Sequence, residues 1–241
     1  MPYQTTRQRL GRFLPVPLRK RLERFLYRLR GTAGARRLHR AVRSGAPLRI
    51  VVGSCGIVEP GWTATDIECL NLLRETDWQR YFSPDSIAVI LAEHVWEHLA
   101  PAEGFAAAKL CHRYLKPGGR LRIAVPDGFH SDPAYIELTR VGGIGAGADD
   151  HQVLYNHETL GQLLVDTGFE VEWLEYFDEA GAFHFREWDP ADGMIHRSQR
   201  FDVRNRDGRL HYTSLLADAR KRAIASPPTF AQEARPRDGA N

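Results

Sequence analysis

Short apolar runs alternate along this chain with segments that have helical spacing. The runs have the length of single strands, and several lack the polar alternation of a strand with one wet face, so they are typical of strands buried on both faces. Such strands are expected at residues 48–53, 62–67, 87–94, 121–125, 169–177 and 210–217. Helical spacing is found at 101–115, before a Lys-Pro-Gly-Gly stop signal, and at 157–167, before Gly168. Because strands alternate with helices, the sequence predicts an α/β fold with a doubly wound, mostly parallel sheet.

An amphipathic pattern marks the N-terminal segment. Leu18, Leu22, Phe25, Leu26 and Leu29 fall on one stripe of a helix. Residues 1–46 carry thirteen Lys and Arg and one acid, so the segment has a formal charge of +12, whereas the rest of the chain has −9. We therefore expect a basic helical arm, whose stripe either packs on the body of the protein or meets an anionic membrane surface through residues 18–30. Nucleic acid is disfavoured as a partner, because no nucleic-acid-binding motif accompanies the charges.

Composition mainly excludes other classes of protein. The chain has 241 residues, 43% hydrophobic and 26% charged, which is ordinary for a globular protein. No apolar run is long enough to predict a membrane span, and the basic N-terminus lacks the apolar stretch of a secretory signal. Cys55, Cys69 and Cys111 have no CxxC spacing, which favours a reduced, cytoplasmic protein over a disulfide scaffold or a zinc module. The expected division is an arm at 1–46, a folded domain at 47–224 with an insertion at 178–209 before the last strand, and a disordered tail at 225–241.

Candidate chemistry begins where the first strand ends. The strand runs into Gly53, Ser54, Cys55 and Gly56, and Asp66 stands near the end of the second strand. Glycines at this place let the backbone approach a ligand, and an acid there can accept hydrogen bonds from both hydroxyls of a ribose. A dinucleotide would also need a helix N-terminus against its pyrophosphate, and the few residues before the second strand, broken by Pro-Gly, cannot form one. The sequence therefore favours an adenosine-containing cofactor without a pyrophosphate.

Several motifs between residues 48 and 220 point to one family. They are VVGSCG at 51–56, GWTATDI at 61–67, DWQRYF at 77–82, AEHVWEHL at 92–99, HRYLKPGGRLRIAVPDG at 112–128, HQVLYNHETL at 151–160, GFEV at 168–171 and RSQRFDVRN at 197–205. In order and spacing they resemble the class I S-adenosylmethionine-dependent methyltransferases, specifically the type-11-like group. The chain departs from the broader superfamily in lacking the long helix after the first strand and one glycine of a GxGxG pattern. The resemblance implies a Rossmann-like methyltransferase fold, S-adenosylmethionine as the cofactor and methyl transfer as the reaction.

The resemblance also implies roles for individual residues. The glycine loop would contact the methionine end of the cofactor, and Asp66 would bind the ribose diol. The remaining implied cofactor contacts are Ile67 beside Asp66, Asp77 at the end of a further strand and at the adenine amino group, Trp78 beside the adenine ring, and Ala92 and Glu93 at the sulfonium. The cofactor supplies the electrophile, so the protein mainly positions the partners and excludes water.

Transfer to a hydroxyl also needs a base, and histidines near the end of the 87–94 strand are the candidates. His94 and His98, joined by His151 further along the chain, suit this task because imidazole titrates near neutral pH. One helical turn separates His94 from His98, which is also a two-ligand metal spacing, but no third ligand is evident and we expect no metal. Alternatively, Glu97 and His98 only orient the following helix.

Asp127, His130, Asp150 and Tyr155 follow the strand at 121–125, where a methyl acceptor would be held. The acceptor is expected to be a small-molecule or sugar hydroxyl, because an acidic body repels nucleic-acid phosphates. Two rival functions stay open. One is a catalytically inactive, membrane-docked binding protein with the same fold. The other is a nicotinamide-dependent oxidoreductase, which the missing helix disfavours. The expected location is the cytoplasm, with the arm allowing peripheral contact at the inner face of a membrane.

Overall fold

The computed structural model describes residues 16–223, so the expected tail at 225–241 and residues 1–15 of the arm lie outside the described residues. The helices are α2 (Val16–Arg43), α3 (Glu75–Gln79), α4 (Pro101–Tyr114), α5 (Pro133–Thr139) and α6 (His157–Asp166), with short 3-10 turns η1 (Trp96–His98), η2 (Ala148–Asp150), η3 (Pro190–Asp192) and η4 (Val203–Asn205). The strands are β1 (Leu48–Val52), β2 (Thr63–Ala64), β3 (Ile87–Glu93), β4 (Leu115–Pro126), β5 (Phe169–Phe177), β6 (Phe183–Phe185) and β7 (Ser214–Lys221).

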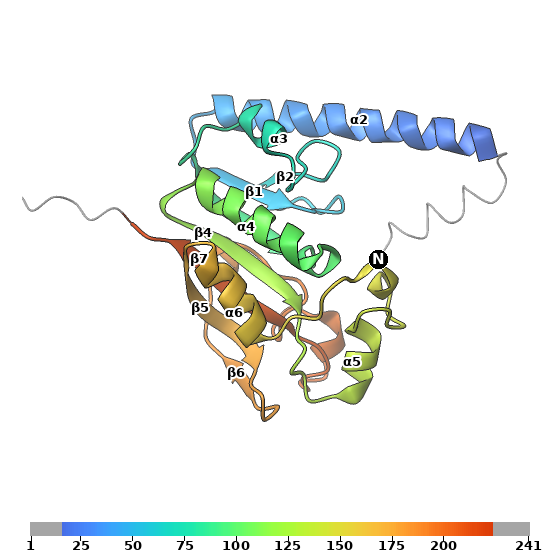
Figure 1. The fold of residues 1–241 in the computed structure, drawn as a ribbon, viewed down its shortest axis with the longest axis vertical. Helices are drawn as coiled ribbons and strands as arrows, with labels where there is room; N and C mark the ends of the chain where they lie inside the picture. Colours follow the sequence, from blue (N-terminus) through green and yellow to red (C-terminus); the bar gives the residue numbers. More distant parts are fainter. Residues whose placement is uncertain (1–15, 224–241) are drawn as a thin grey trace, which may run out of the picture.

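All seven strands form one sheet in the order β2-β1-β3-β4-β7-β5-β6 (Figure 1). Strands β2, β1, β3 and β4 are parallel neighbours. Beyond β4 the sheet becomes antiparallel, because β7 runs against both β4 and β5, and β6 runs against β5. The expected Rossmann-like α/β class is confirmed, although half of the neighbouring strand pairs are antiparallel.

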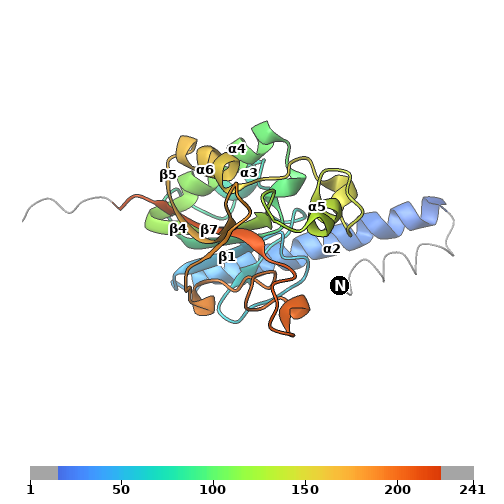
Figure 2. The same cartoon turned by 90° about the horizontal axis from the view of Figure 1, so that it is seen from below.

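The apolar runs form central strands because their residues point alternately into two cores. In β1, Ile50 and Val52 join the larger core, whereas Val51 joins the smaller one on the opposite face. Helices α3, α4 and α6 cover the larger core, as Figure 2 shows from below. The smaller core is covered by irregular chain after β6, which contributes Trp188 and Ile195. Much of the segment 178–209 thus covers one face of the sheet, and its being an insertion stays a prediction.

A buried ion pair ties that cover to the sheet. Arg122 of β4 and Asp218 of β7 are register partners, and the guanidinium donates two hydrogen bonds of 2.8 and 2.9 Å to the carboxylate. The same guanidinium donates to the carbonyl oxygens of Asp189 and Gly193 in the covering segment. Both side chains are about 2–3% exposed. Such a pair is held by its full set of partners, and removing one partner leaves a costly buried charge.

The basic arm is one long helix with two different halves. Near its C-terminal end, Leu38 is fully buried in the larger core, and a Cβ on Gly34 would lie 2.5 Å from Cys69 Sγ. Further towards the N-terminus, Phe25, Leu26 and Leu29 are 57%, 39% and 50% exposed. The part of the stripe that the structure describes therefore does not pack on the body. Helix α2 extends past the sheet in Figure 1, and no helix among the described residues is long and apolar enough to cross a bilayer.

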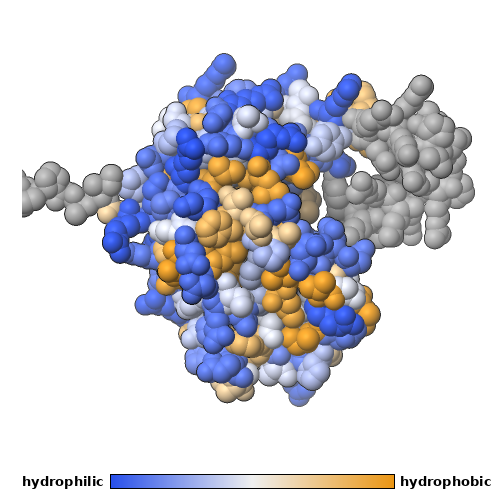
Figure 3. Space-filling view, in the orientation of Figure 1, coloured by the Kyte–Doolittle hydropathy of each residue, from blue (hydrophilic) through white to orange (hydrophobic). Residues whose placement is uncertain are grey.

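Several expected boundaries are wrong. The second strand has two residues rather than six, because only Thr63 and Ala64 pair with β1. The last strand begins at Ser214 rather than at residue 210. No strand forms around residue 77, where the chain makes α3 instead. In the orientation of Figure 1, the space-filling view shows hydrophobic residues gathered in patches over the middle of the molecule and bordered by hydrophilic ones (Figure 3).

Candidate functional site

The loop after β1 approaches the chain that follows β3. Gly53 has a φ of +62°, and a Cβ on it would lie 2.6 Å from Val95 Cγ2. Glycine therefore suits this position for its conformation and for its lack of a side chain. Strands β2 and β3 lie on opposite sides of β1, so the loop sits at a topological switch point of the sheet. Crevices at such points are the usual ligand sites of open α/β sheets.

Asp66 faces this loop from the chain after β2. The hydroxyl of Ser54 donates a hydrogen bond of 2.9 Å to Asp66 Oδ2, and the backbone N–H of Cys55 donates one of 2.8 Å to Oδ1. Burial raises the pKa of the Asp66 carboxyl, and the two hydrogen bonds oppose that shift. Each carboxylate oxygen can accept a second hydrogen bond. The neighbouring Ile67 is 62% exposed, which leaves apolar surface beside the carboxylate.

At the end of β3, Ala92 is fully buried and Glu93 is engaged by the chain that covers the smaller core. Its two carboxylate oxygens accept hydrogen bonds from the backbone N–H groups of Arg197, at 2.7 Å, and His196, at 3.2 Å. His196 in turn lies 3.0 Å from Glu59. Glu93 therefore fixes the covering segment against the strand end.

His94 stands next, with a left-handed φ of +55°, and belongs to a buried polar chain. Its Nε2 lies 2.9 Å from the hydroxyl of Ser214, which donates its own proton to the carbonyl of Arg197. His94 Nε2 is therefore a donor. Its Nδ1 lies 2.9 Å from Glu97 Oε1, so a proton is shared between the imidazole and the carboxylate. Burial alone would raise the pKa of Glu97, but His94 and His98 hold it below its usual range.

His98, His151 and Asp150 come together beside this chain. The two imidazole rings meet edge to face with centroids 4.9 Å apart. His98 Nδ1 lies 3.5 Å from Asp150 Oδ2, and His151 Nδ1 donates to the carbonyl of Thr139 at 2.7 Å. Tyr155 is nearly buried, and burial raises the pKa of its phenol to about 12. The structure thus brings together all three expected histidines, Asp150 and Tyr155.

Asp77 and Trp78 have structural partners in and around α3. Asp77 is part of α3, and its carboxylate accepts a hydrogen bond from the backbone N–H of Asn71. Trp78 is fully enclosed in the larger core and stacks on Tyr114 with ring centroids 5.2 Å apart. The expected strand that was to present them does not form. The strand is therefore wrong, and a contact of either side chain with adenine stays a prediction that these partners do not favour.

Asp127 and His130 also have structural partners. Both carboxylate oxygens of Asp127 are occupied, by the backbone N–H groups of Phe129 at 3.0 Å and Phe177 at 2.8 Å. Burial raises the pKa of this carboxyl to about 6. His130 stacks on Tyr135 with centroids 3.8 Å apart, and burial lowers its pKa to about 4. We retain neither residue in the candidate site.

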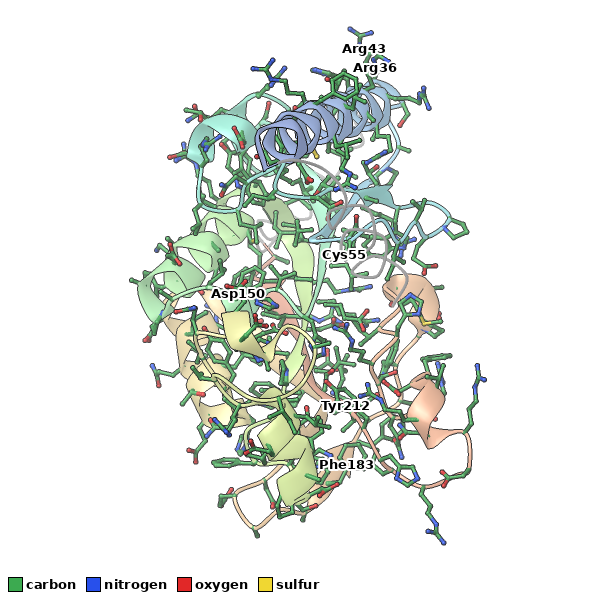
Figure 4. All side chains as sticks on the ribbon, turned by 90° about the vertical axis from the view of Figure 1, so that its right-hand side faces the viewer. Arg36, Arg43, Cys55, Asp150, Phe183 and Tyr212 are labelled. Carbon is green, nitrogen blue, oxygen red and sulfur yellow. The ribbon has the colours of Figure 1, made fainter. Side chains whose placement is uncertain are left out.

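Tyr212, which the sequence did not single out, also lies at the site. Figure 4 shows it on the same side of the molecule as Cys55 and Asp150, between α2 at the top and Phe183 at the bottom. The Tyr212 ring lies 6.3 Å from the His94 ring and carries the Arg204 guanidinium 3.3 Å above its centroid. Arg204 falls within the RSQRFDVRN motif, whereas no sequence pattern marks Tyr212.

Comparison with known proteins gives similarity only at the level of structure. No protein-family model and no curated protein matches the sequence. A solved S-adenosylmethionine-dependent methyltransferase from Archaeoglobus fulgidus is 16% identical, with a TM-score of 0.43 over 80% of this chain and 94% of that one. A possible histamine N-methyltransferase from Thermotoga maritima is 15% identical, with a TM-score of 0.42 over 84% and 96%. An O-methyltransferase family protein from Burkholderia thailandensis is 13% identical, with a TM-score of 0.43 over 82% and 57%.

Identities and scores this low do not place the chain in a family. The sheet order and the site geometry described above are observed in the structure of this chain and do not depend on the comparisons. Membership of the type-11-like group stays a prediction.

Proposed function

We propose that this protein is an S-adenosylmethionine-dependent methyltransferase that acts on a hydroxyl of a small molecule or sugar. The observation that carries the proposal is the pairing of the glycine loop with Asp66 at the switch point of the sheet. Gly53 has no room for a side chain, and the Asp66 carboxylate is oriented by two hydrogen bonds from the same loop. A close backbone approach beside an oriented acid suits an adenosine ligand.

The residues present fit such a cofactor. Gly53 supports the methionine end, Asp66 accepts the ribose hydroxyls, and the exposed Ile67 offers its side chain to the adenine in place of Trp78. The backbone at Ala92 and Glu93 lines the sulfonium, since the Ala92 side chain is buried and the Glu93 carboxylate is held by the covering segment. When bound, S-adenosylmethionine supplies a methyl group on an electrophilic sulfonium, so the protein needs to align the acceptor and exclude water.

The described chain has no helix between β1 and β2, so no helix N-terminus is available there for a pyrophosphate. This supports a cofactor without a pyrophosphate and speaks against a nicotinamide-dependent oxidoreductase.

His98 is the best placed of the three histidines to accept a proton. Its side chain is 33% exposed, whereas that of His94 is 9% exposed and held between Glu97 and Ser214. His151 uses one nitrogen on the Thr139 carbonyl. His98 therefore takes the acceptor proton, His94 and Glu97 position the strand end, and Asp150 and Tyr155 are candidate acceptor contacts.

Calorimetric titration of the full chain with S-adenosylmethionine tests the cofactor assignment. Asp66→Ala should weaken binding about ten- to a hundredfold, because hydrogen bonds to a charged group contribute roughly 1.5–3 kcal/mol. Asp207→Ala is the matched control, since Asp207 is a surface carboxylate paired with His211 far along the chain. Equal affinity in the wild type and Asp66→Ala would remove Asp66 from the site.

A further inference from the structure

We propose that Glu97, His98 and His151 form a binding site for one divalent first-row transition-metal ion. The three side chains offer a carboxylate oxygen and two imidazole nitrogens that all lie within 4.8 Å of one another. The sequence pointed to His94 and His98 and found no third ligand. The structure replaces His94 with Glu97 and brings His151 from a distant part of the chain.

The backbone holds the two parts of the site together. Glu97 and His98 stand on η1, and His151 follows η2. The carbonyl oxygen of Glu97 accepts hydrogen bonds from the N–H groups of Gln152, at 2.7 Å, and Val153, at 3.3 Å. The segment after His151 is therefore fixed to the residue that carries the carboxylate, and the site is built before any ion arrives.

Unsatisfied polar atoms gather at this place. Among the described residues, the buried side-chain polar atoms without a hydrogen-bond partner include Glu97 Oε2, His98 Nδ1 and the hydroxyl of Tyr155. The other oxygen of Glu97, Oε1, lies 2.9 Å from His94 Nδ1. Because Glu97 is fully buried, its Oε2 has no solvent to replace the missing partner. Such an atom is costly, and a bound cation would satisfy it together with the ring nitrogen of His98.

His151 is oriented as metal-binding histidines are. Its Nδ1 is 2.7 Å from the Thr139 carbonyl, so Nδ1 carries the proton and Nε2 presents a lone pair. A backbone carbonyl on the other ring nitrogen is the usual support for a ligating imidazole.

The donor set decides the class of ion. Two imidazoles and one carboxylate suit Zn²⁺, Co²⁺ and their first-row neighbours, whereas Mg²⁺ and Ca²⁺ prefer sites made of oxygen alone. Ligand atoms around a tetrahedral Zn²⁺ at ~2.1 Å lie about 3.4 Å apart, so side-chain rotations of the order of 1 Å would close the set. Three protein ligands leave coordination positions open for an acceptor oxygen.

The site rests on the ligands alone, but its role rests on the proposed function. With an ion bound, His98 would be a ligand and solvent would replace it as the proton acceptor, because a metal-bound hydroxyl would lose its proton more readily. The oxygen lone pair then forms a bond to the methyl carbon while the carbon–sulfur bond breaks, which leaves the methyl ether and S-adenosylhomocysteine.

Titration of the chelator-treated full chain with Co²⁺, followed by its visible absorption, tests the site. We expect one Co²⁺ per chain, displaced by Zn²⁺. His151→Ala and Glu97→Gln should each weaken binding at least about tenfold, because loss of a supporting second-layer partner alone costs 10- to 100-fold. If Glu97→Gln does not fold, His98→Ala, with its part-exposed side chain, provides the same test.

His157→Ala is the matched control, because His157, Glu158 and Glu179 form the other group of the described chain that could hold a cation, on a more exposed surface. It should leave the Co²⁺ spectrum unchanged. No Co²⁺ binding by the full chain, or a spectrum lost in His157→Ala and kept in His151→Ala, would overturn the proposal.

The two proposals fail separately. Unchanged S-adenosylmethionine binding in a chain that takes no Co²⁺ would overturn the metal site only. Tight Co²⁺ binding in a chain that does not bind S-adenosylmethionine would overturn the methyltransferase only.

Discussion

Substitution of Gly53 by alanine tests whether the loop after β1 is as tightly placed as the structure indicates. The new methyl group meets two obstacles. The backbone has a φ of +62°, and Val95 Cγ2 would be 2.6 Å from the new Cβ.

The two costs can be assigned separate magnitudes. An L-residue in the left-handed conformation costs roughly 1–2 kcal/mol. Forcing an extra methyl group into a packed site costs typically about 1–3 kcal/mol. Gly53→Ala should therefore lower the free energy of unfolding by about 2–5 kcal/mol. It should also weaken S-adenosylmethionine binding, because the loop must shift away from Val95.

Gly61→Ala isolates the conformational part. Gly61 lies in the same connection, with a φ of +79° and nothing within 4 Å of an added Cβ. Urea unfolding should show a loss of only about 1–2 kcal/mol for Gly61→Ala. Adding Val95→Ala to Gly53→Ala should restore part of the packing loss, so the two changes should couple favourably. Equal unfolding curves for Gly53→Ala and Gly61→Ala, with unchanged ligand affinity, would refute the close approach of the loop to Val95.

Three other predictions address catalysis, pH and the arm. His98→Ala should lower turnover while cofactor affinity stays near that of the wild type. A lower melting temperature with turnover per folded molecule preserved would instead show an orienting role. The pKa of Asp127 is raised by burial from 3.8 to about 6, so the folded state binds more protons and stability should fall by up to roughly 3 kcal/mol as pH rises from about 4 to 6. Unfolding curves of Asp127→Asn should lack this fall, and an unchanged pH profile would contradict it. The full chain should co-sediment with anionic vesicles but not with neutral ones and be released by salt, whereas a chain beginning at Thr32 should stay in the supernatant; equal sedimentation of the two chains would rule out the arm as the contact.

The sequence predicted the helix of the arm but not where the arm begins to pack on the domain. The leucine stripe and the charges predicted a helical arm at 1–46 separate from the domain at 47–224, so a chain beginning at Pro47 would be expected to fold. Leu38 lies in the larger core, so that truncation would open the core. A cut at Thr32 keeps the packed half of α2 and removes the half that carries Phe25 and Leu29.

The central strands were predictable because the cores on both faces of the sheet make β1, β3 and the 121–125 part of β4 mostly apolar, apart from Arg49, Glu93 and Arg122. The edge strand β2 was overestimated, since Asp66 and Ile67 belong to the loop that faces the site. Trp78 was misplaced because an aromatic residue in a short segment fits a core helix as well as a strand end.

Contacts between distant residues were the least accessible from the sequence. Arg122 and Asp218 look like surface charges in their strands, but the segment after β6 buries them. The meeting of Glu97 with His151 depends on how the chain after α5 returns to η1. No local spacing encodes that path.

The most direct measurement of the central claim is a crystal structure of the full chain with S-adenosylhomocysteine. The proposed function predicts the ribose hydroxyls on the Asp66 carboxylate, the amino-acid end against the loop at Gly53, and the sulfur near Ala92 on the side of His98. A ligand bound elsewhere, or a ribose without contact to Asp66, would contradict the assignment of this crevice as the cofactor site.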